Sequence, residues 1–302
     1  MKILILGSEG FIGSAAVRYF LQQGAEVTGC DLFEAPVISG KYRYLKLSRL
    51  SPELDEVLGF QQFDVFINAA GSGNVSYSVT HPFIDFEANT LDVYRILDAI
   101  RRLQTSCKYI QLSSAAVYGN PVELPVKETA ACKPVSPYGY HKLMAELVCR
   151  EFYELYSVPV AIIRPFSVYG PGLKKQLFWD LFRKYKSGQS PVEVWGTGNE
   201  SRDFIFIEDL IKCIHVIIDR SPFDCSVYNA GSEKEITIRE AVTMLFSDLD
   251  PSATILFNQQ VREGDPLNWR SSANSIKEIG FSLETEFEQG IKKLAAWYKS
   301  LN

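Results

Sequence analysis

Short apolar runs alternate with helical patterns through the first half of the chain. Continuous apolar strands are predicted at 3–6, 26–30, 42–47, 64–68, 108–112 and 160–163. Amphipathic helices are predicted at 11–23, 82–103 and 137–156. Apolar strands that alternate with helices indicate a parallel sheet buried between two helical layers. We therefore predict an α/β fold with a doubly wound parallel sheet.

The pattern changes after Arg164. Turns rich in glycine interrupt it at 169–172 and 195–198. A strand at about 203–207 and a helix at about 209–219 then indicate a return to the sheet. A last helix is predicted at about 284–301.

The length of 302 residues suits one large domain or two moderate ones. We expect residues 1–165 and a return segment at about 203–228 to form the larger domain. Residues 166–202 and 229–302 should form a smaller C-terminal lobe.

Charge and hydropathy exclude several kinds of partner. The formal net charge is -5, whereas a nucleic-acid-binding face needs a basic stripe. No apolar stretch approaches the roughly 20 residues of a membrane span. The apolar run before Gly7 is too short for the core of a signal peptide. We expect a cytoplasmic protein that binds neither nucleic acid nor a membrane.

The cysteines and histidines do not suggest a metal site. No two of the six cysteines have C-x-x-C spacing, and their apolar surroundings fit reduced, buried thiols. The three histidines, His81, His141 and His215, are dispersed along the chain. We expect each of them to be structural.

A glycine pattern follows the first strand and opens the first helix. It reads Gly7-x-x-Gly10-x-x-Gly13. Such glycines allow a tight turn and close approach of the backbone to a pyrophosphate, which the helix N-terminus then receives. The alternative is an ordinary turn between strand and helix, but the strand and helix context favours dinucleotide binding.

Asp31 ends the second predicted strand, about 20 residues beyond this loop. A carboxylate there accepts hydrogen bonds from the adenosine ribose hydroxyls of NAD and repels a 2′-phosphate. Leu32 to Ala35 supply no cation beside it. The sequence therefore predicts NAD rather than NADP, and the alternative is an aspartate that merely caps a loop.

Tyr138 and Lys142 lie at the start of the second long helix, where positions i and i+4 share one face. A tyrosine has a pKa near 10, so a base working near neutral pH needs that pKa lowered by about 3 units. A neighbouring ammonium and a cationic nicotinamide ring can lower it. The alternative for Y-x-x-x-K alone is a pair of surface residues.

Ser113 and Ser114 directly follow the strand at 108–112. Ligands bind at the carboxyl ends of such strands, where a hydroxyl can share a proton with a sugar hydroxyl and the tyrosine. The alternative is that the serines satisfy a turn at the end of the strand.

Further motifs complete an ordered set. In order they are Gly7-x-x-Gly10-x-x-Gly13, Asn68-Ala-Ala70, Ser113-Ser114-x-x-Val-Tyr-Gly119, Tyr138-x-x-x-Lys142, Arg164-Pro-Phe-Ser-Val-Tyr-Gly-Pro-Gly172 and Arg202-Asp-Phe204. Tyr228-Asn-Ala-Gly231 and Arg262-Glu-Gly-Asp265 extend it. The chain resembles the extended short-chain dehydrogenase/reductase family, in its nucleotide-sugar epimerase/dehydratase branch. The resemblance covers nearly the whole chain.

The resemblance implies a Rossmann-type dinucleotide-binding domain, bound NAD, and a nucleoside-diphosphate sugar held by the C-terminal lobe. Tyr138 would be the catalytic base or acid, Lys142 would lower its pKa and hold the nicotinamide ribose, and Ser114 would bind the reacting hydroxyl. The implied cofactor-binding residues are Gly7, Gly10, Phe11, Ile12, Gly13, Asp31, Leu32, Asn68, Ala69, Ala70, Ser113, Tyr138, Lys142 and Pro165.

The resemblance also implies substrate contacts and an assembly. Arg202 and Arg262 look like the arginines that clasp the diphosphate, as guanidinium forks bind phosphate well. A surface ion pair is the alternative for each arginine. Ser167 stands where the family often has asparagine at the substrate phosphate. The helices that begin near Pro82 and Pro137 form a bundle between subunits in relatives, which predicts a homodimer.

One departure narrows the reaction. Dehydratases of this branch carry an acidic pair directly after the serine or threonine, where this chain has Ala115 and Ala116. Methyl groups cannot transfer protons, which argues against 4,6-dehydration. Sugar-acid decarboxylases of the family tend to have a glutamate at the second of these positions, so Ala116 argues against decarboxylation as well.

We therefore predict an NAD-dependent epimerase that acts on C4 of a nucleoside-diphosphate sugar through a transient 4-keto intermediate. The alternative is a 4-reductase of a nucleoside-diphosphate 4-keto-6-deoxyhexose in surface-polysaccharide synthesis. A third hypothesis, from another class, is a catalytically idle NAD sensor or scaffold.

Overall fold

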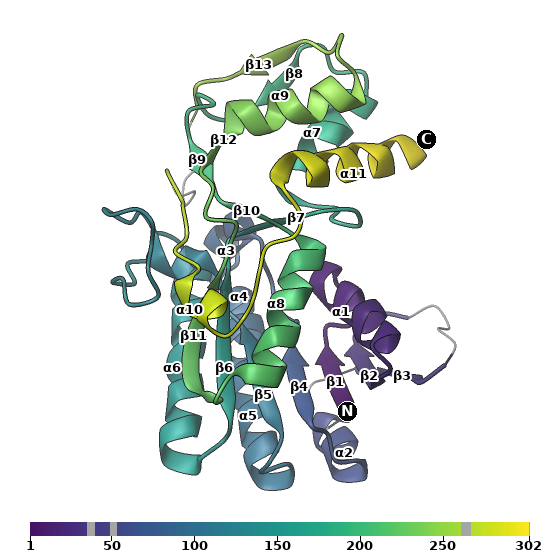
Figure 1. Cartoon of the computed structure of the whole chain (residues 1–302), viewed down its shortest axis with the longest axis vertical. Coiled ribbons are helices and arrows are strands. Elements are labelled where there is room, and N and C mark those ends of the chain that lie inside the picture. Colours follow the sequence, from purple (N-terminus) through teal and green to yellow (C-terminus); the bar gives the residue numbers. More distant parts are fainter. Residues whose placement is uncertain (35–39, 49–52, 261–266, 302) are drawn as a thin grey trace.

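The computed structural model describes residues 1–34, 40–48, 53–260 and 267–301. Its centre is a seven-stranded sheet in the order β11-β6-β5-β4-β1-β2-β3, in which all neighbouring strands are parallel (Figure 1). The strands are β1 (Lys2–Leu6), β2 (Glu26–Asp31), β3 (Tyr42–Lys46), β4 (Val65–Asn68), β5 (Lys108–Leu112), β6 (Val160–Pro165) and β11 (Asp224–Ala230). The predicted fold class is confirmed.

Helices cover both faces of this sheet. Helices α1 (Phe11–Gln22) and α8 (Ile207–Arg220) pack on one face, and α2 (Glu53–Phe60), α5 (Asp92–Leu103) and α6 (Pro137–Tyr156) pack on the other. Strand β1 shows why both faces need cover. Ile3 and Ile5 belong to the core under α1 and α8, whereas Leu4 and Leu6 belong to the core under the other helices. Side chains of a strand point to alternate faces, so a strand apolar at every position is buried on both.

The predicted helix at 82–103 is not one regular helix. It consists of α4 (Pro82–Phe86), a π-helical turn (Glu87–Leu91) and α5. A π-turn inserts one residue into a helix, which an apolar spacing of three and four residues does not reveal. The π-turn places Asn89 so that its side-chain amide donates to the Ser72 carbonyl oxygen, 3.2 Å away.

The predicted return of a strand at 203–207 to the sheet is wrong. The short strand found there, β10 (Phe204–Phe206), pairs with β7 (Ser167–Tyr169) in a separate two-stranded sheet. The strand that joins the central sheet is β11, beside β6. A three-residue apolar strand looks the same in sequence whichever partner it takes, so its neighbours decide its place.

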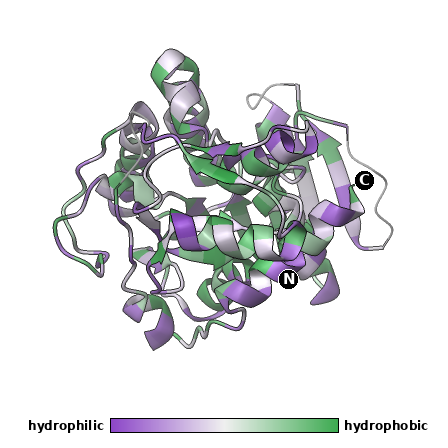
Figure 2. Cartoon of the chain, turned by 90° about the horizontal axis from the view of Figure 1, so that it is seen from above, coloured by the Kyte–Doolittle hydropathy of each residue, from purple (hydrophilic) through white to green (hydrophobic). Residues whose placement is uncertain are grey.

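The remaining elements lie mostly above the carboxyl ends of the strands in Figure 1. They are α3 (Val75–Thr80), α7 (Gln176–Lys186), β8 (Val192–Val194), β9 (Ser201–Arg202), β12 (Ile236–Thr237), α9 (Ile238–Leu249), β13 (Ile255–Phe257), α10 (Asn274–Glu278) and α11 (Phe287–Ser300). Strand β8 pairs with β13, and β9 pairs with β12. Seen from above, the helices show both hydrophobic and hydrophilic sides (Figure 2).

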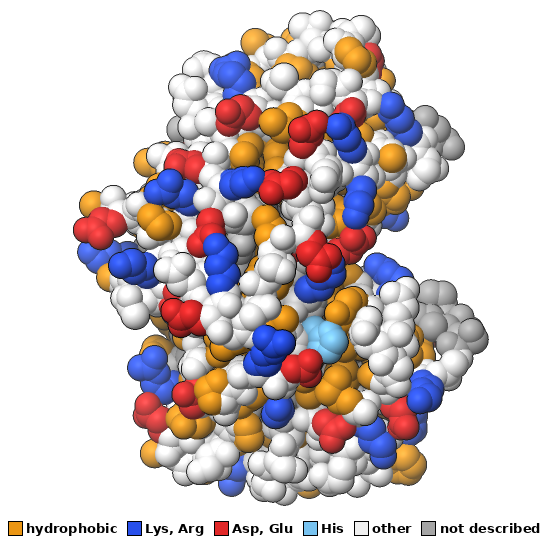
Figure 3. Space-filling model, in the orientation of Figure 1, with side chains coloured by type: hydrophobic (Ala, Val, Ile, Leu, Met, Phe, Trp, Pro, Cys, Tyr) orange, Lys and Arg blue, Asp and Glu red, His pale blue; other side chains and the backbone are white. Residues whose placement is uncertain are grey.

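The surface carries charges of both signs. On the face in Figure 3, acidic and basic side chains are interspersed, and a notch lies between the part built on the central sheet and the part above it. Among the described residues, no helix combines the length and the apolar character that crossing a membrane requires. The same part of the chain contains no group of three His, Cys, Asp or Glu side chains that could hold a metal ion.

Candidate active site

The loop between β1 and α1 has room only for glycine at two points. Gly7 has a φ of +78°, and a Cβ built on it would lie 2.7 Å from the backbone nitrogen of Ala70. A Cβ on Gly13 would lie 2.0 Å from the carbonyl oxygen of Gly7. Gly10 is the N-cap residue of α1 and provides no side-chain cap. The first N–H groups of the helix therefore remain available for a pyrophosphate, and the loop fits a dinucleotide.

Asp31 lies beside this loop because β2 is the neighbour of β1 in the sheet. Its carboxylate accepts hydrogen bonds from the backbone N–H of Glu9 at 2.9 Å and of Leu32 at 2.7 Å. Burial, and then the charge of Asp31, raise the pKa of the Glu9 carboxyl. Two acidic side chains close to each other favour hydroxyl donors over a phosphate at this place.

Asn68, at the end of β4, directs its side chain into the protein. Its amide nitrogen donates to the Tyr109 hydroxyl at 2.9 Å, and its amide oxygen accepts from the Ala70 N–H at 3.2 Å. The backbone of Ala69 and Ala70 is what lies against Gly7. The structure thus brings this segment to the glycine loop, with Asn68 shaping the turn.

Tyr138 and Lys142 lie together in the first turns of α6. Ser136 caps this helix by accepting from the Gly139 N–H at 3.2 Å, and the Ser78 hydroxyl of α3 accepts from the Tyr138 N–H at 3.1 Å. The Lys142 ammonium lies 5.9 Å from the centre of the Tyr138 ring and donates to the Leu112 carbonyl oxygen at 3.0 Å. The helix start therefore holds both side chains at the end of β5.

Ser114 lies beside Tyr138. Its hydroxyl is close enough to the phenol to act as a hydrogen-bonding group that lowers the pKa of Tyr138. The same hydroxyl accepts from the Ala116 N–H at 3.1 Å and caps the short 3-10 turn over Ala115–Tyr118. The turn-forming interpretation of Ser114 is confirmed, and this role leaves its hydroxyl beside Tyr138.

The structure changes the expected electrostatics of the pair. Burial raises the pKa of Tyr138 to about 12, and the hydrogen bond from Ser114 only partly opposes it. Burial also lowers the pKa of Lys142 to about 8. The sequence analysis expected nearby positive charge to lower the pKa of Tyr138. Within the chain itself, the loss of water around the phenol is the larger effect, and it raises that pKa.

Ser113 takes part in a different network. Its hydroxyl donates to Glu146 of α6. Glu146 forms a two-point ion pair with Arg164 of β6, with N···O distances of 2.9 and 2.6 Å. Arg164 also donates to the Tyr118 hydroxyl at 2.7 Å. This buried network ties together the end of β5, β6 and α6, the helix that carries Tyr138 and Lys142.

Two of the predicted substrate residues lie in short strands outside the central sheet, Ser167 in β7 beside β10 and Arg202 in β9 beside β12. Pro165 ends β6, and Ser167 begins β7 and donates its N–H to the Asp203 carbonyl oxygen at 2.9 Å. The Arg202 guanidinium donates to the Ser201 carbonyl oxygen at 2.8 Å and lies 5.8 Å from the Trp269 ring. Trp269 belongs to a buried cluster that contains Ala115, Ala116 and Tyr138. Arg262 lies outside the described residues.

The model of the NAD dependent epimerase/dehydratase family matches residues 3–231. The chain belongs to this family. Over 99% of both chains it is 28% identical to a putative UDP-glucose 4-epimerase of Methanocaldococcus jannaschii. It is 26% identical to the dTDP-glucose 4,6-dehydratase of Salmonella typhimurium, over 99% of this chain and 92% of the relative.

Solved structures agree with this membership. The UDP-glucuronic acid 4-epimerase of Bacillus cereus, crystallised with UDP-glucuronic acid and NAD, has a TM-score of 0.91 and 25% identity over the full length of both chains. The predicted membership of the nucleotide-sugar branch of extended short-chain dehydrogenases/reductases is confirmed. Enzyme activity and NAD dependence follow from the family.

The sequence analysis did not predict two charged residues, Asp85 and Lys175, that lie near Lys142. Asp85 of α4 lies 2.6 Å from the Nδ1 atom of His141, inside the protein. The Lys175 ammonium lies 3.5 Å from a Cβ built on Gly73, and its charge acts on Lys142. Neither residue belongs to a motif, so only the three-dimensional structure reveals that they lie near Lys142.

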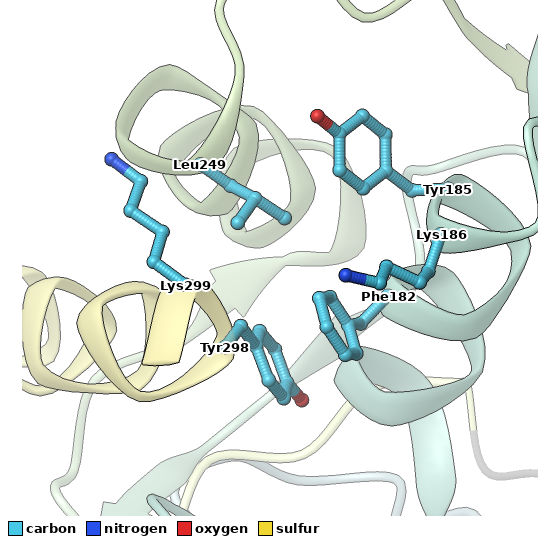
Figure 4. Close-up of a pocket in the computed structure, with 6 residues that line it drawn as sticks. All are labelled: Phe182, Tyr185, Lys186, Leu249, Tyr298 and Lys299. Atoms are coloured by element: carbon cyan, nitrogen blue, oxygen red, sulfur yellow. The ribbon is translucent and has the colours of Figure 1, made fainter. Parts of the chain in front are cut away.

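A cavity of about 330 Å³ lies elsewhere, between α7, α9 and α11 (Figure 4). The stacked rings of Phe182 and Tyr298, 4.3 Å apart, form part of its lining, with Lys186 and Lys299 nearby. None of the predicted site residues lines it. The chemistry of the glycine loop and of Tyr138 therefore belongs to a separate place.

Proposed function

We propose that the protein is an NAD-dependent epimerase that acts on C4 of a nucleoside-diphosphate sugar through a transient 4-keto intermediate. The arrangement of Ser114, Tyr138 and Lys142 at the end of β5 carries this proposal. Relatives and solved structures named as 4-epimerases of UDP-sugars support the same reaction.

The glycine loop supports the cofactor part of the proposal. The N–H groups at the start of α1 would bind the pyrophosphate, and Asp31 would accept from the adenosine ribose. Lys142 would hold the nicotinamide ribose and place a positive charge beside Tyr138. Bound there, NAD would supply the hydride acceptor and donor that the reaction at C4 needs.

The side chains of the site would handle the proton. Tyr138 removes the proton of the C4 hydroxyl as C4 is oxidised, and Ser114 holds that hydroxyl by a hydrogen bond. The resulting 4-keto sugar presents its other face, is reduced at C4, and recovers the proton from Tyr138. Sugar oxidation and reduction balance, so the cofactor is not consumed.

The alanines after Ser114 favour epimerisation over dehydration. Ala115 and Ala116 occupy the positions where an acid and a base would be needed to remove water. Their turn packs tightly on the catalytic helix, because a Cβ on Gly139 would lie 2.7 Å from the Ala116 carbonyl oxygen. Epimerisation at C4 needs neither group.

The diphosphate of the substrate would bind near β7 and β9. Arg202 would supply a guanidinium there and Ser167 a hydroxyl. The resemblance implies Arg262, which lies outside the described residues, as a second arginine for the diphosphate. The residues of the upper lobe would then form the substrate-binding part of the protein, as the division 166–202 and 229–302 proposes.

The test is direct. Purified protein with NAD is incubated with a panel of nucleotide sugars, and the anomeric protons are followed by NMR. A second anomeric signal without a lasting rise in NADH absorbance is expected, and Tyr138→Phe should abolish it. If no 4-hydroxy sugar gives a new signal, and 4-keto-6-deoxy sugars instead oxidise NADH, the reductase of surface-polysaccharide synthesis replaces the epimerase.

We also propose a cytoplasmic homodimer. Apolar side chains are exposed on the outer sides of α4, α5 and α6, among them Phe83 at 68% and Leu147 at 59%. Exposed apolar patches of this kind support an interface. Leu147→Glu should convert dimer to monomer in light scattering, whereas Leu256→Glu, on β13 in the upper lobe, should not.

The cytoplasmic location is supported by the cysteines. All six are free thiols, which fits a reducing compartment.

A further inference from the structure

A buried aspartate–histidine pair lies against the catalytic helix. Asp85 of α4 is fully buried, and one of its carboxylate oxygens lies 2.6 Å from the Nδ1 atom of His141. His141 follows Tyr138 by three positions and directly precedes Lys142. Tyr138, His141 and Lys142 are all buried on α6, so the aspartate faces the part of the helix that carries the catalytic side chains.

The pair is poorly explained as a stabilising contact. The second carboxylate oxygen of Asp85 is buried and has no hydrogen-bond partner among the described residues. A buried charge that is only half satisfied costs free energy. The ring of Phe86 packs edge-on against the imidazole, with ring centres 5.6 Å apart. A costly carboxylate next to the active site points to a role in the chemistry.

The charged surroundings of Lys142 identify that role. Burial is the main influence on Lys142 and favours loss of its proton. The negative charge of Asp85 is the largest opposing influence, with smaller support from Cys149 and Glu146 of the same helix. Lys175, which precedes α7, acts in the direction of burial. Asp85 also raises the pKa of Tyr138, though less than burial does.

We propose that Asp85 is a positioning residue that keeps the Lys142 ammonium protonated, and that His141 holds its carboxylate in place. The 2.6 Å contact between the imidazole Nδ1 atom and the carboxylate fixes the position of the Asp85 side chain. This inference rests on the proposed function, since the ammonium matters there as the partner of Tyr138. It gives His141 a role in the site in addition to the structural one expected from the sequence.

The test measures the protonation of Lys142 without any substrate. Protein loaded with NAD is labelled with ¹³C at the lysine Cε atoms, and the Lys142 signal is assigned by its loss in Lys142→Arg. The midpoint of its pH titration is compared between wild type and Asp85→Asn. Removal of the negative charge should move the midpoint down by about 1 pH unit, the usual effect of one close charge. Equal midpoints would overturn the proposal.

The matched control is Thr90→Val. The Thr90 hydroxyl donates to the His141 carbonyl oxygen at 2.9 Å, so it braces the same turn of α6 without carrying charge. Its loss should lower the melting temperature and leave the Lys142 midpoint unchanged. A similar shift in Thr90→Val would mean that the turn is merely structural, which also overturns the proposal.

A second variant covers the case in which Asp85→Asn does not fold. His141→Leu removes the imidazole that holds the Asp85 carboxylate in place. Its Lys142 midpoint should also fall below that of wild type, and an unchanged midpoint would contradict the proposal. Because the titration needs no sugar, failure of the nucleotide-sugar panel would refute the proposed function without affecting this result.

Discussion

Glu146→Gln tests the ion pair that supports the catalytic helix. The Glu146 and Arg164 side chains are only 7% and 6% exposed, and two hydrogen bonds join them. Removing one partner of a buried pair costs about 3–5 kcal/mol, because the other charge is left uncompensated. The glutamine keeps one oxygen for Arg164, so we expect the lower limit, about 3 kcal/mol. That is a large part of the roughly 5–15 kcal/mol by which proteins are stable.

The free energy of unfolding is measured by urea titration, with circular dichroism and tryptophan fluorescence required to give the same transition. Glu288→Gln is the control, because its pair with Lys292 lies on the surface, and no measurable change is expected. The double variant Glu146→Leu/Arg164→Met should recover most of the lost stability. A loss below about 1 kcal/mol in Glu146→Gln would refute the argument.

Three further predictions concern catalysis and the cofactor. Ser114→Ala should lower kcat about 10²-fold with little change in KM, because the Tyr138 phenol loses its hydrogen bond; an unchanged kcat in steady-state assays would count against that role. Gly7→Ala should weaken NAD binding at least about tenfold in calorimetry, since its Cβ would lie 2.7 Å from the Ala70 nitrogen. Gly24→Ala, which has a similar φ but nothing within 4 Å, should bind NAD normally. Asp31→Ser should narrow the preference for NAD over NADP about tenfold in binding assays, and an unaltered preference would exclude Asp31 as its cause.

The central sheet was predictable because its strands are short, apolar and separated by helical patterns. Six of its seven strands lie where the pattern places them. The seventh strand was expected at 203–207, where β10 lies, but it is β11. The two strands differ in the strand that each pairs with, and the local sequence does not reveal this difference. The π-turn at Glu87–Leu91 was missed for a related reason, since one inserted residue leaves an amphipathic helix pattern almost intact.

The site was predictable where a motif reflects local geometry. The glycine loop and the spacing of Tyr138 and Lys142 are of this kind. The contact between Asp85 and His141 joins residues that are 56 positions apart, and no motif in either segment predicts it. The direction of the Tyr138 pKa shift depends on burial by the surrounding fold, which a motif does not encode.

Tracing the hydrogen at C4 tests the central claim most directly. A UDP-sugar that the enzyme accepts is prepared with deuterium at C4 and converted in ordinary water with NAD. If oxidation and reduction at C4 use the same hydride, the epimeric product retains the deuterium at C4, and Tyr138→Phe forms no product. An epimer that has lost its C4 deuterium to solvent, or full conversion by Tyr138→Phe, would contradict the account.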